Sequence, residues 1–105
     1  MSAFDWLFGS NTHLRHHTAL GHTFEFDLVK RPDGEVRIYI ADSPSYGSRA
    51  ADGHSTHRYY DASERRHFVC VRDDLVPSNI SDAKDWARYW AENTSAYISR
   101  GREFS

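Results

Sequence analysis

The clearest pattern in the chain is an alternation of hydrophobic and polar residues in two runs on either side of a turn. Such alternation predicts strands with one buried face and one exposed face. The hydrophobic positions of the two runs are Phe24, Phe26, Leu28, Val36, Ile38 and Ile40. Between the runs, Pro32 fixes φ near the value that a turn needs, and Gly34 can take a positive φ. We therefore expect a β-hairpin over roughly residues 23–41.

The turn also determines how the two strands should pair. If residues 32–34 form a three-residue loop, Leu28 lies opposite Ile38 and Phe26 lies opposite Ile40. A shift of one residue would send one apolar set to the other side of the sheet. The turn chemistry and the hydrophobic pattern therefore predict the same register.

A second hairpin is expected over roughly residues 56–72. Residues 57–60 form a short aromatic run, and residues 66–72 are the most strand-like segment of the chain. Residues 61–64 between them are typical of a turn. Because residues 68–71 are hydrophobic without a break, we expect that strand to be covered on both faces and to lie inside the sheet.

The C-terminal part of the chain has the spacing of an amphipathic helix over roughly residues 81–100. Its apolar stripe consists of Ala83, Trp86, Ala87, Trp90, Thr94, Tyr97 and Ile98. Ser81 suits the N-cap, and Gly101 suits the position just after the helix. We expect this helix to lay both tryptophans across one face of the sheet.

The first 22 residues allow two interpretations. Residues 3–8 fit one helical turn, and residues 12–20 fit a short helix that Gly21 would end. The competing interpretation of residues 12–20 is a strand in which His16, Thr18 and Leu20 alternate. We take the helical interpretation. The prediction is thus one α+β domain over residues 1–105, with an antiparallel sheet of about four strands, the C-terminal helix on one face and short helical segments at the N-terminus.

Composition narrows the class of protein. The chain has 105 residues, 39% hydrophobic and 27% charged, with a net charge of −2. A single cysteine, Cys70, excludes an internal disulfide and fits a reducing compartment. No run is long enough to cross a membrane, and the N-terminus lacks the pattern of a secretory signal. We expect a soluble, cytoplasmic protein that does not associate with membranes.

The seven histidines raise the question of a metal site. On a short helix, His13, His16 and His17 would share one face, and His54 could join them around a zinc ion. Against this, the chain has no second cysteine and no His-Glu-x-x-His pattern. Surface and partly buried histidines with hydrogen-bonded rings are the preferred explanation of the count. We expect no cofactor, and a histidine-rich zinc-binding protein is one alternative.

Residues 42–56 join two expected strands and are long for a loop in a small domain, so they are a candidate binding segment. They contain Tyr46, Arg49 and His54, and Arg58 follows closely. Tyrosine and arginine often anchor protein interfaces. The preferred hypothesis is a small non-catalytic protein–protein interaction module, with the build of inhibitor, immunity-type or regulatory accessory proteins. Its partner would be another protein.

Two further classes of protein are a nucleic-acid-binding domain, which is the second alternative, and an enzyme. The second hairpin, residues 57–72, is rich in aromatic and basic side chains, which in nucleic-acid-binding domains stack on bases and hold phosphates. The residues concerned are Arg58, Tyr59, Tyr60, Arg65, Arg66, His67 and Arg72. Acidic neighbours dilute this charge, so nucleic acid is the less favoured partner.

No Gly-x-Ser-x-Gly motif or glycine-rich phosphate loop is present, and the sequence therefore favours a non-catalytic protein over an enzyme.

Overall fold

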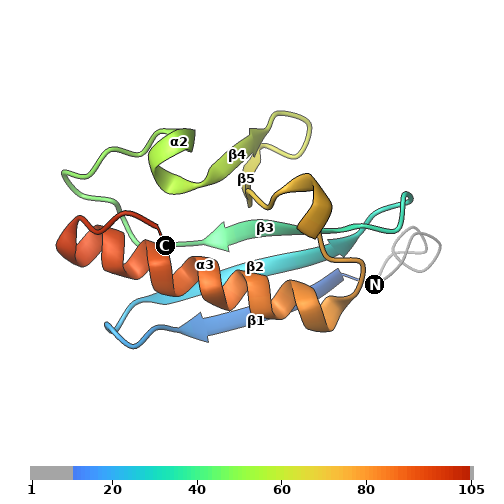
Figure 1. The fold of residues 1–105 in the computed structure, drawn as a ribbon, viewed down its shortest axis with the longest axis horizontal. Coiled ribbons are helices and arrows are strands. Elements are labelled where there is room, and N and C mark those ends of the chain that lie inside the picture. The colour runs from blue at the N-terminus through green and yellow to red at the C-terminus, as the bar shows by residue number, and fades with distance from the viewer. Residues whose placement is uncertain (1–10, 105) are drawn as a thin grey trace.

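A computed structural model describes residues 11–104, which form one antiparallel sheet with a long helix across one face (Figure 1). The strands are β1 (Asn11–His17), β2 (Thr23–Lys30), β3 (Val36–Asp42), β4 (Arg58–Asp61) and β5 (Arg66–Val69), in the spatial order β1-β2-β3-β5-β4. The helices are α2 (Gly53–Thr56), the 3-10 helix η1 (Asp73–Leu75) and α3 (Ile80–Arg100). The predicted α+β class is confirmed, but the sheet has five strands and not about four.

The first hairpin forms in the predicted register. Leu28 pairs with Ile38 and Phe26 with Ile40, so their side chains share the buried side of the sheet. Gly34 has a φ of 92°, a left-handed conformation that glycine adopts without steric cost. The turn chemistry and the hydrophobic pattern were therefore sufficient to place these strands.

The prediction of a helix over residues 12–20 is wrong, because Asn11–His17 is the edge strand β1. Every residue of β1 pairs with a residue of β2, and Leu14 is buried opposite Phe26. A helix of this length gains little stability alone. Pairing with β2 instead satisfies the backbone N–H and C=O groups along one edge of the segment. The competing strand interpretation is correct for residues 12–17, whereas Thr18 and Leu20 lie beyond the end of β1. The helical turn expected at residues 3–8 lies outside the described residues.

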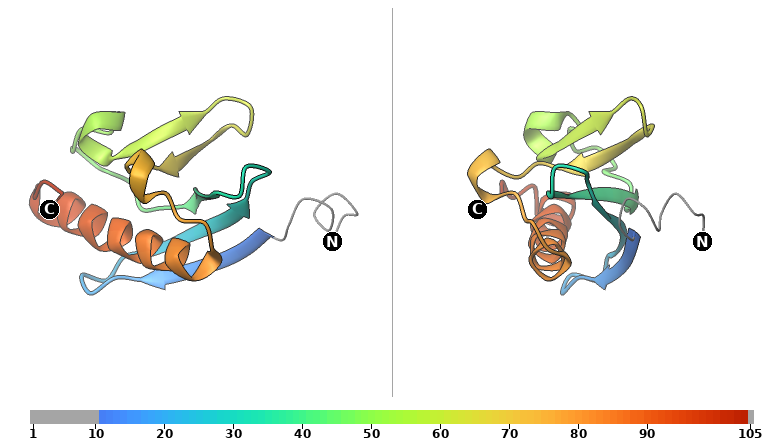
Figure 2. Two further views of the ribbon diagram at one scale, coloured as in Figure 1. Left: turned by 45° about the vertical axis from the view of Figure 1, so that its right-hand side comes forward. Right: turned by 90° about the vertical axis from the view of Figure 1, so that its right-hand side faces the viewer.

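The predicted C-terminal helix is confirmed as α3, which runs along β1, β2 and β3 (Figure 2). Trp90 is buried and meets Phe24 and Phe26 edge to face, with ring centroids 5.7 and 6.0 Å apart. Small residues on the same stripe, among them Ala83 and Ala87, let the helix approach the sheet closely. The hydrophobic core therefore lies between α3 and the first three strands.

Three details at the edges of α3 bear on the predictions. The N-cap is Asn79, whose side chain accepts a hydrogen bond from the backbone N–H of Asp82, and not Ser81. Gly101 is the left-handed residue after the last turn, as predicted. Trp86 is only half-buried, so one of the two tryptophans lies at the margin of the core.

The second hairpin also forms, with β4 as an edge strand and β5 between β4 and β3. Phe68 of β5 pairs with Tyr39 of β3, and this is where the hairpin joins the rest of the sheet. None of the helices within residues 11–104 is long and apolar enough to cross a membrane.

Candidate functional site

Tyr46 of the predicted binding loop lies in the interior. It is 9% exposed, and its ring meets that of Tyr97 at a centroid distance of 6.1 Å. The guanidinium of Arg58 lies 4.7 Å from the centre of the same ring, which is cation–π geometry. Burial raises the pKa of the Tyr46 phenol, and its hydroxyl has no hydrogen-bond partner. Tyr46 and Arg58 thus pack the loop against α3.

Arg49 and His54, the other predicted binding residues of the loop, lie in different surroundings from Tyr46. Arg49 donates from Nε to the carbonyl oxygen of Ile98, 3.3 Å away, at the end of α3. Nearby, the hydroxyl of Tyr97 donates to the carbonyl oxygen of Ala50. His54 lies in α2 and is exposed. The structure thus separates the predicted site residues into an internal group and one exposed histidine, and their part in binding a partner stays a prediction.

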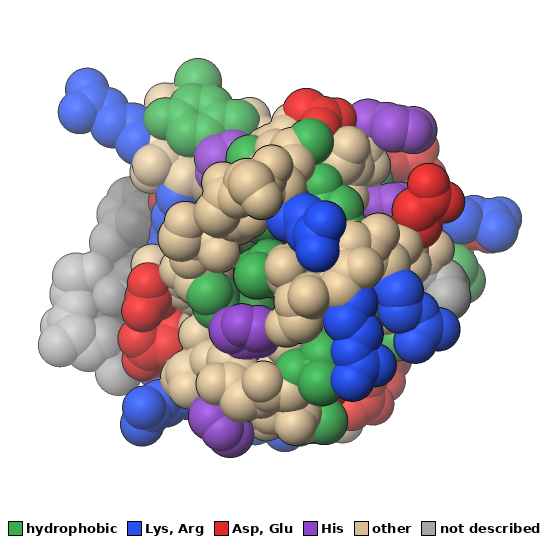
Figure 3. Space-filling view, turned by 90° about the vertical axis from the view of Figure 1, so that its left-hand side faces the viewer, with side chains coloured by type: hydrophobic (Ala, Val, Ile, Leu, Met, Phe, Trp, Pro, Cys, Tyr) green, Lys and Arg blue, Asp and Glu red, His purple; other side chains and the backbone are tan. Residues whose placement is uncertain are grey.

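The four predicted metal ligands are not brought together. His13 and His17 lie on the open face of the sheet, and His16 faces α3, where it hydrogen-bonds with Glu92. His54 belongs to α2, on the far side of the fold from β1 (Figure 1). No group of three or more metal-binding side chains occurs among residues 11–104. The space-filling view shows histidines at separate places from the top to the bottom of one face (Figure 3).

The basic residues of the second hairpin mostly contact acidic or aromatic groups of the same chain. Arg66 donates to Asp27 and Glu64, and Arg72 pairs with Asp74. Tyr59 and Tyr60 remain 57% exposed, although Tyr59 meets Phe68 and Tyr60 meets His67. Because the partly buried Arg66 already has two carboxylate partners, the hairpin offers less free positive charge than its sequence indicates, although the Arg72–Asp74 pair is exposed.

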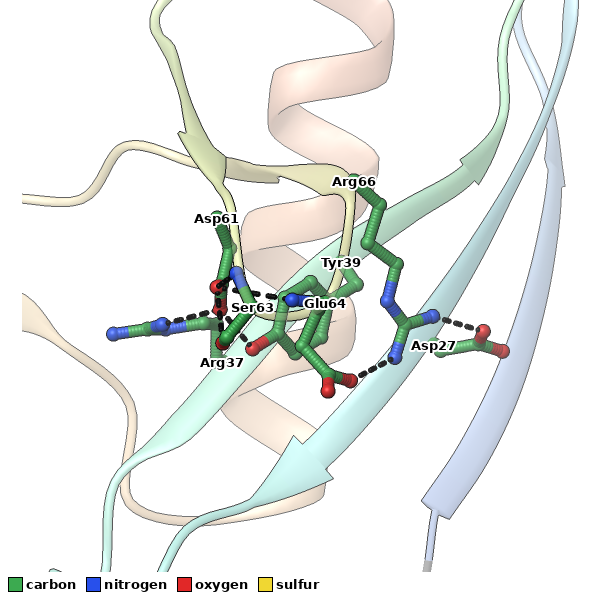
Figure 4. A network of polar contacts seen from close by, with 7 residues as sticks. All are labelled: Asp27, Arg37, Tyr39, Asp61, Ser63, Glu64 and Arg66. Atoms are coloured by element: carbon green, nitrogen blue, oxygen red, sulfur yellow. Dashed lines mark hydrogen bonds and ion pairs between the residues drawn. The ribbon is translucent and has the colours of Figure 1, made fainter.

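The open face of the sheet carries a network of charged and aromatic groups that joins the two hairpins (Figure 4). Asp61 accepts hydrogen bonds from Tyr39, at 2.7 Å, and from Arg37, at 3.1 Å, and its other oxygen accepts from Ser63. The hydrogen bonds from Ser63 and Tyr39 hold the pKa of Asp61 far below its usual value. Asp61 therefore stays charged and fixes the β4–β5 turn.

A second part of the network lies on β1 and β2. His13 approaches Asp27 with Nδ1, at 3.0 Å, and Glu25 with Nε2, at 3.1 Å. These two hydrogen bonds raise the pKa of His13, chiefly through Asp27. Burial alone would raise the pKa of Asp27, but hydrogen bonds from His13 and Arg66 outweigh it and lower that pKa. Each of these charged groups has an oppositely charged or hydrogen-bonding partner within the chain, so the network stabilises the fold.

A surface that sequence reasoning missed lies between α3 and the segment from η1 to the helix start. It is a groove of about 580 Å³, called the α3 groove from here on. One wall carries Leu75, Val76, Pro77 and Ser78, and the other carries Trp86 and Tyr89, with Asp74, Asp82 and Asp85 completing the lining. The helical residues lie three and four positions apart, which places them on one face of α3.

The α3 groove exposes large apolar side chains to solvent. Leu75 is 46% exposed and Tyr89 is 47% exposed, with the half-buried Trp86 in contact with Tyr89. A second hollow of about 220 Å³ shares Leu75, Trp86 and Tyr89 with the groove and reaches Phe104. Together they form a continuous apolar surface. The signal in the sequence was the isolated Leu75 after two aspartates, together with Trp86, which was assigned to the buried stripe.

Comparison with known proteins adds no relatives. No family model matches the chain, and neither the curated proteins nor the solved structures include a match.

Proposed function

We propose that this domain is a non-catalytic protein-binding module and that the α3 groove is its contact surface. The observation that carries the proposal is the exposure of Leu75 and Tyr89 around the half-buried Trp86 in a groove of about 580 Å³. A monomeric domain rarely leaves a connected apolar surface open to water unless that surface binds something. Tryptophan and tyrosine are also the residues on which protein interfaces most often depend.

The other candidate surfaces are less suited to binding a partner than the α3 groove. On the open sheet face, Asp27 and Asp61 pair with Arg66 and Arg37. In the second hairpin, Arg66 and Arg72 have carboxylate partners and Arg58 packs on the ring of Tyr46. Tyr46 and Arg49 hold the 42–56 loop against α3, so His54 is the exposed one among the predicted binding residues of that loop. The single cysteine, Cys70, supports the cytoplasm as the compartment in which the module works.

The experiment that tests this function selects peptides from a random twelve-residue library displayed on phage, with the folded wild-type protein as bait. Selected peptides are then measured against the double variant Leu75→Ser/Tyr89→Ser. The matched control is Tyr59→Ser/Tyr60→Ser, which removes two similarly exposed tyrosines from β4. Circular dichroism confirms that both variants fold.

We expect the groove variant to bind at least about tenfold more weakly than wild type, because anchoring aromatic residues carry most of the energy of an interface. The control variant should bind as wild type does. Equal binding to all three proteins would overturn the proposal, and so would a failure to enrich any peptide over an unrelated bait.

A further inference from the structure

The α3 groove is acidic as well as apolar. Its lining contains three carboxylates, from Asp74, Asp82 and Asp85, and no lysine or arginine. The cations of the first half of the helix, Lys84 and Arg88, do not line it. A ligand in the groove would therefore meet the apolar side chains of its two walls and, at its exposed margin, the carboxylates of Asp74 and Asp85.

These carboxylates are free to exchange their present partners. Asp74 pairs with Arg72 at 3.0 Å, but both side chains are largely exposed. Asp85 approaches Arg88 at 3.4 Å, and Asp82 accepts a hydrogen bond from the uncharged amide of Asn79. Exposed ion pairs contribute little because water screens them and the side chains lose freedom in forming them. A cation brought in by a partner can replace these contacts at small cost.

We infer that the segment that binds in the α3 groove is a positively charged stretch of protein with an aromatic or aliphatic anchor. This inference rests on the proposed function of the groove. The anchor would lie against Leu75, Trp86 and Tyr89, while flanking lysine or arginine side chains pair with the carboxylates. Arginine suits the margin best, because its guanidinium can bind one carboxylate through two parallel hydrogen bonds.

The same charges disfavour other occupants. Nucleic acid would bring phosphates against three aspartates, and an acidic peptide would be repelled in the same way. A second copy of the chain docked groove to groove would set Asp82 and Asp85 of one copy near those of the other. The acidic margin thus acts as a selectivity element in addition to the apolar walls.

The test uses the same peptide library and a variant that neutralises the margin, Asp74→Asn/Asp85→Asn. Asp82 is left unchanged because it serves the start of α3. The control is Asp42→Asn/Glu103→Gln, which removes two exposed carboxylates outside the groove and changes the net charge by the same amount.

We expect the selected peptides to be enriched in lysine and arginine on both sides of an apolar residue. Their affinity should fall roughly two- to thirtyfold on the margin variant, given the strength of two exposed ion pairs, and should not change on the control. Their affinity for wild type should also fall as the salt concentration rises.

The outcomes separate the inference from the proposed function. Peptides that require Leu75 and Tyr89 but show no excess of basic residues, and that bind the margin variant as well as wild type, would overturn the inference and leave the function standing. Peptides that do not depend on Leu75 and Tyr89 would overturn both.

Discussion

The rings of Trp86 and Tyr89 meet edge to face on the exposed side of α3, with centroids 5.8 Å apart and planes at 89°. Three residues apart on a helix, they lie on the same face, so the backbone of α3 holds the pair in place. Two aromatic rings that are ordered before a partner arrives lose less conformational entropy on binding. This arrangement is consistent with a preformed contact surface.

If Leu75 serves binding and not folding, its replacement should leave the fold stable. We expect Leu75→Ser to change the free energy of unfolding by no more than about 0.5 kcal/mol, as for most surface substitutions. Trp90→Ala, which removes a buried ring between Phe24 and Phe26, should cost about 3–5 kcal/mol. Urea denaturation measures both. A loss from Leu75→Ser comparable to that from Trp90→Ala would assign Leu75 to the core.

The buried hydroxyl of Tyr46 gives a second prediction. Because this hydroxyl has no partner, Tyr46→Phe removes an unsatisfied polar group and should leave stability unchanged or slightly higher. The matched variant Tyr97→Phe removes the hydrogen bond to the carbonyl oxygen of Ala50 and should cost about 0.5–1.5 kcal/mol. Thermal unfolding of the two variants gives the comparison. A large loss in Tyr46→Phe would reveal a partner for its hydroxyl.

His13 should make the stability depend on pH. Both of its ring nitrogens face carboxylates, which only accept, so both can donate together only when the ring is protonated. Its pKa is raised above 6.5 by Asp27 and Glu25. Its contribution to stability should therefore be complete below pH 6.5 and disappear as the pH rises through the raised value. We expect the stability difference between wild type and His13→Gln to shrink over that interval.

An NMR titration of the His13 ring provides the direct measurement for this prediction, and its midpoint should lie above 6.5. In Glu25→Gln, where one of the two carboxylates is lost, the midpoint should move down toward the ordinary value. A midpoint at or below 6.5 in wild type would show that the two contacts do not form in solution.

The start of α3 gives a fourth prediction. Asn79 accepts the hydrogen bond from Asp82 at 2.8 Å, so Asn79→Ala should lower stability by about 1 kcal/mol. Ser81 is the second residue of the helix, two positions after the N-cap, and Ser81→Ala should be nearly neutral. Chemical denaturation distinguishes the two variants. A larger loss of stability in Ser81→Ala than in Asn79→Ala would identify Ser81 as the N-cap, as the sequence alone indicated.

The parts of the fold that the sequence predicted well are those with local signals. Pro32 and Gly34 define the turn, and the alternating residues on both sides agree with it, so the register of β2 and β3 followed. The long stripe of α3 and Gly101 at its end were equally clear. In these segments a single interpretation of the sequence pattern was consistent with the backbone geometry and with the burial of the apolar side chains.

The parts that the sequence did not predict depend on contacts between distant segments. β1 carries one large buried apolar residue, Leu14, and its histidines have helical spacing by coincidence, so only its pairing with β2 identifies it as a strand. Trp86 has the spacing of a buried residue. Nothing in the local sequence shows that Trp86 is only half-buried, so the isolated Leu75 was the one remaining signal of the α3 groove.

The central claim, that the α3 groove is the binding surface, is tested most directly by NMR with isotope-labelled protein and the tightest-binding selected peptide. We predict that the backbone amide signals that shift most belong to Leu75, Val76, Ser78 and the segment from Asp82 to Tyr89. Shifts concentrated in the 42–56 loop around His54, or on the open face of the sheet around His13 and Asp27, would contradict the claim.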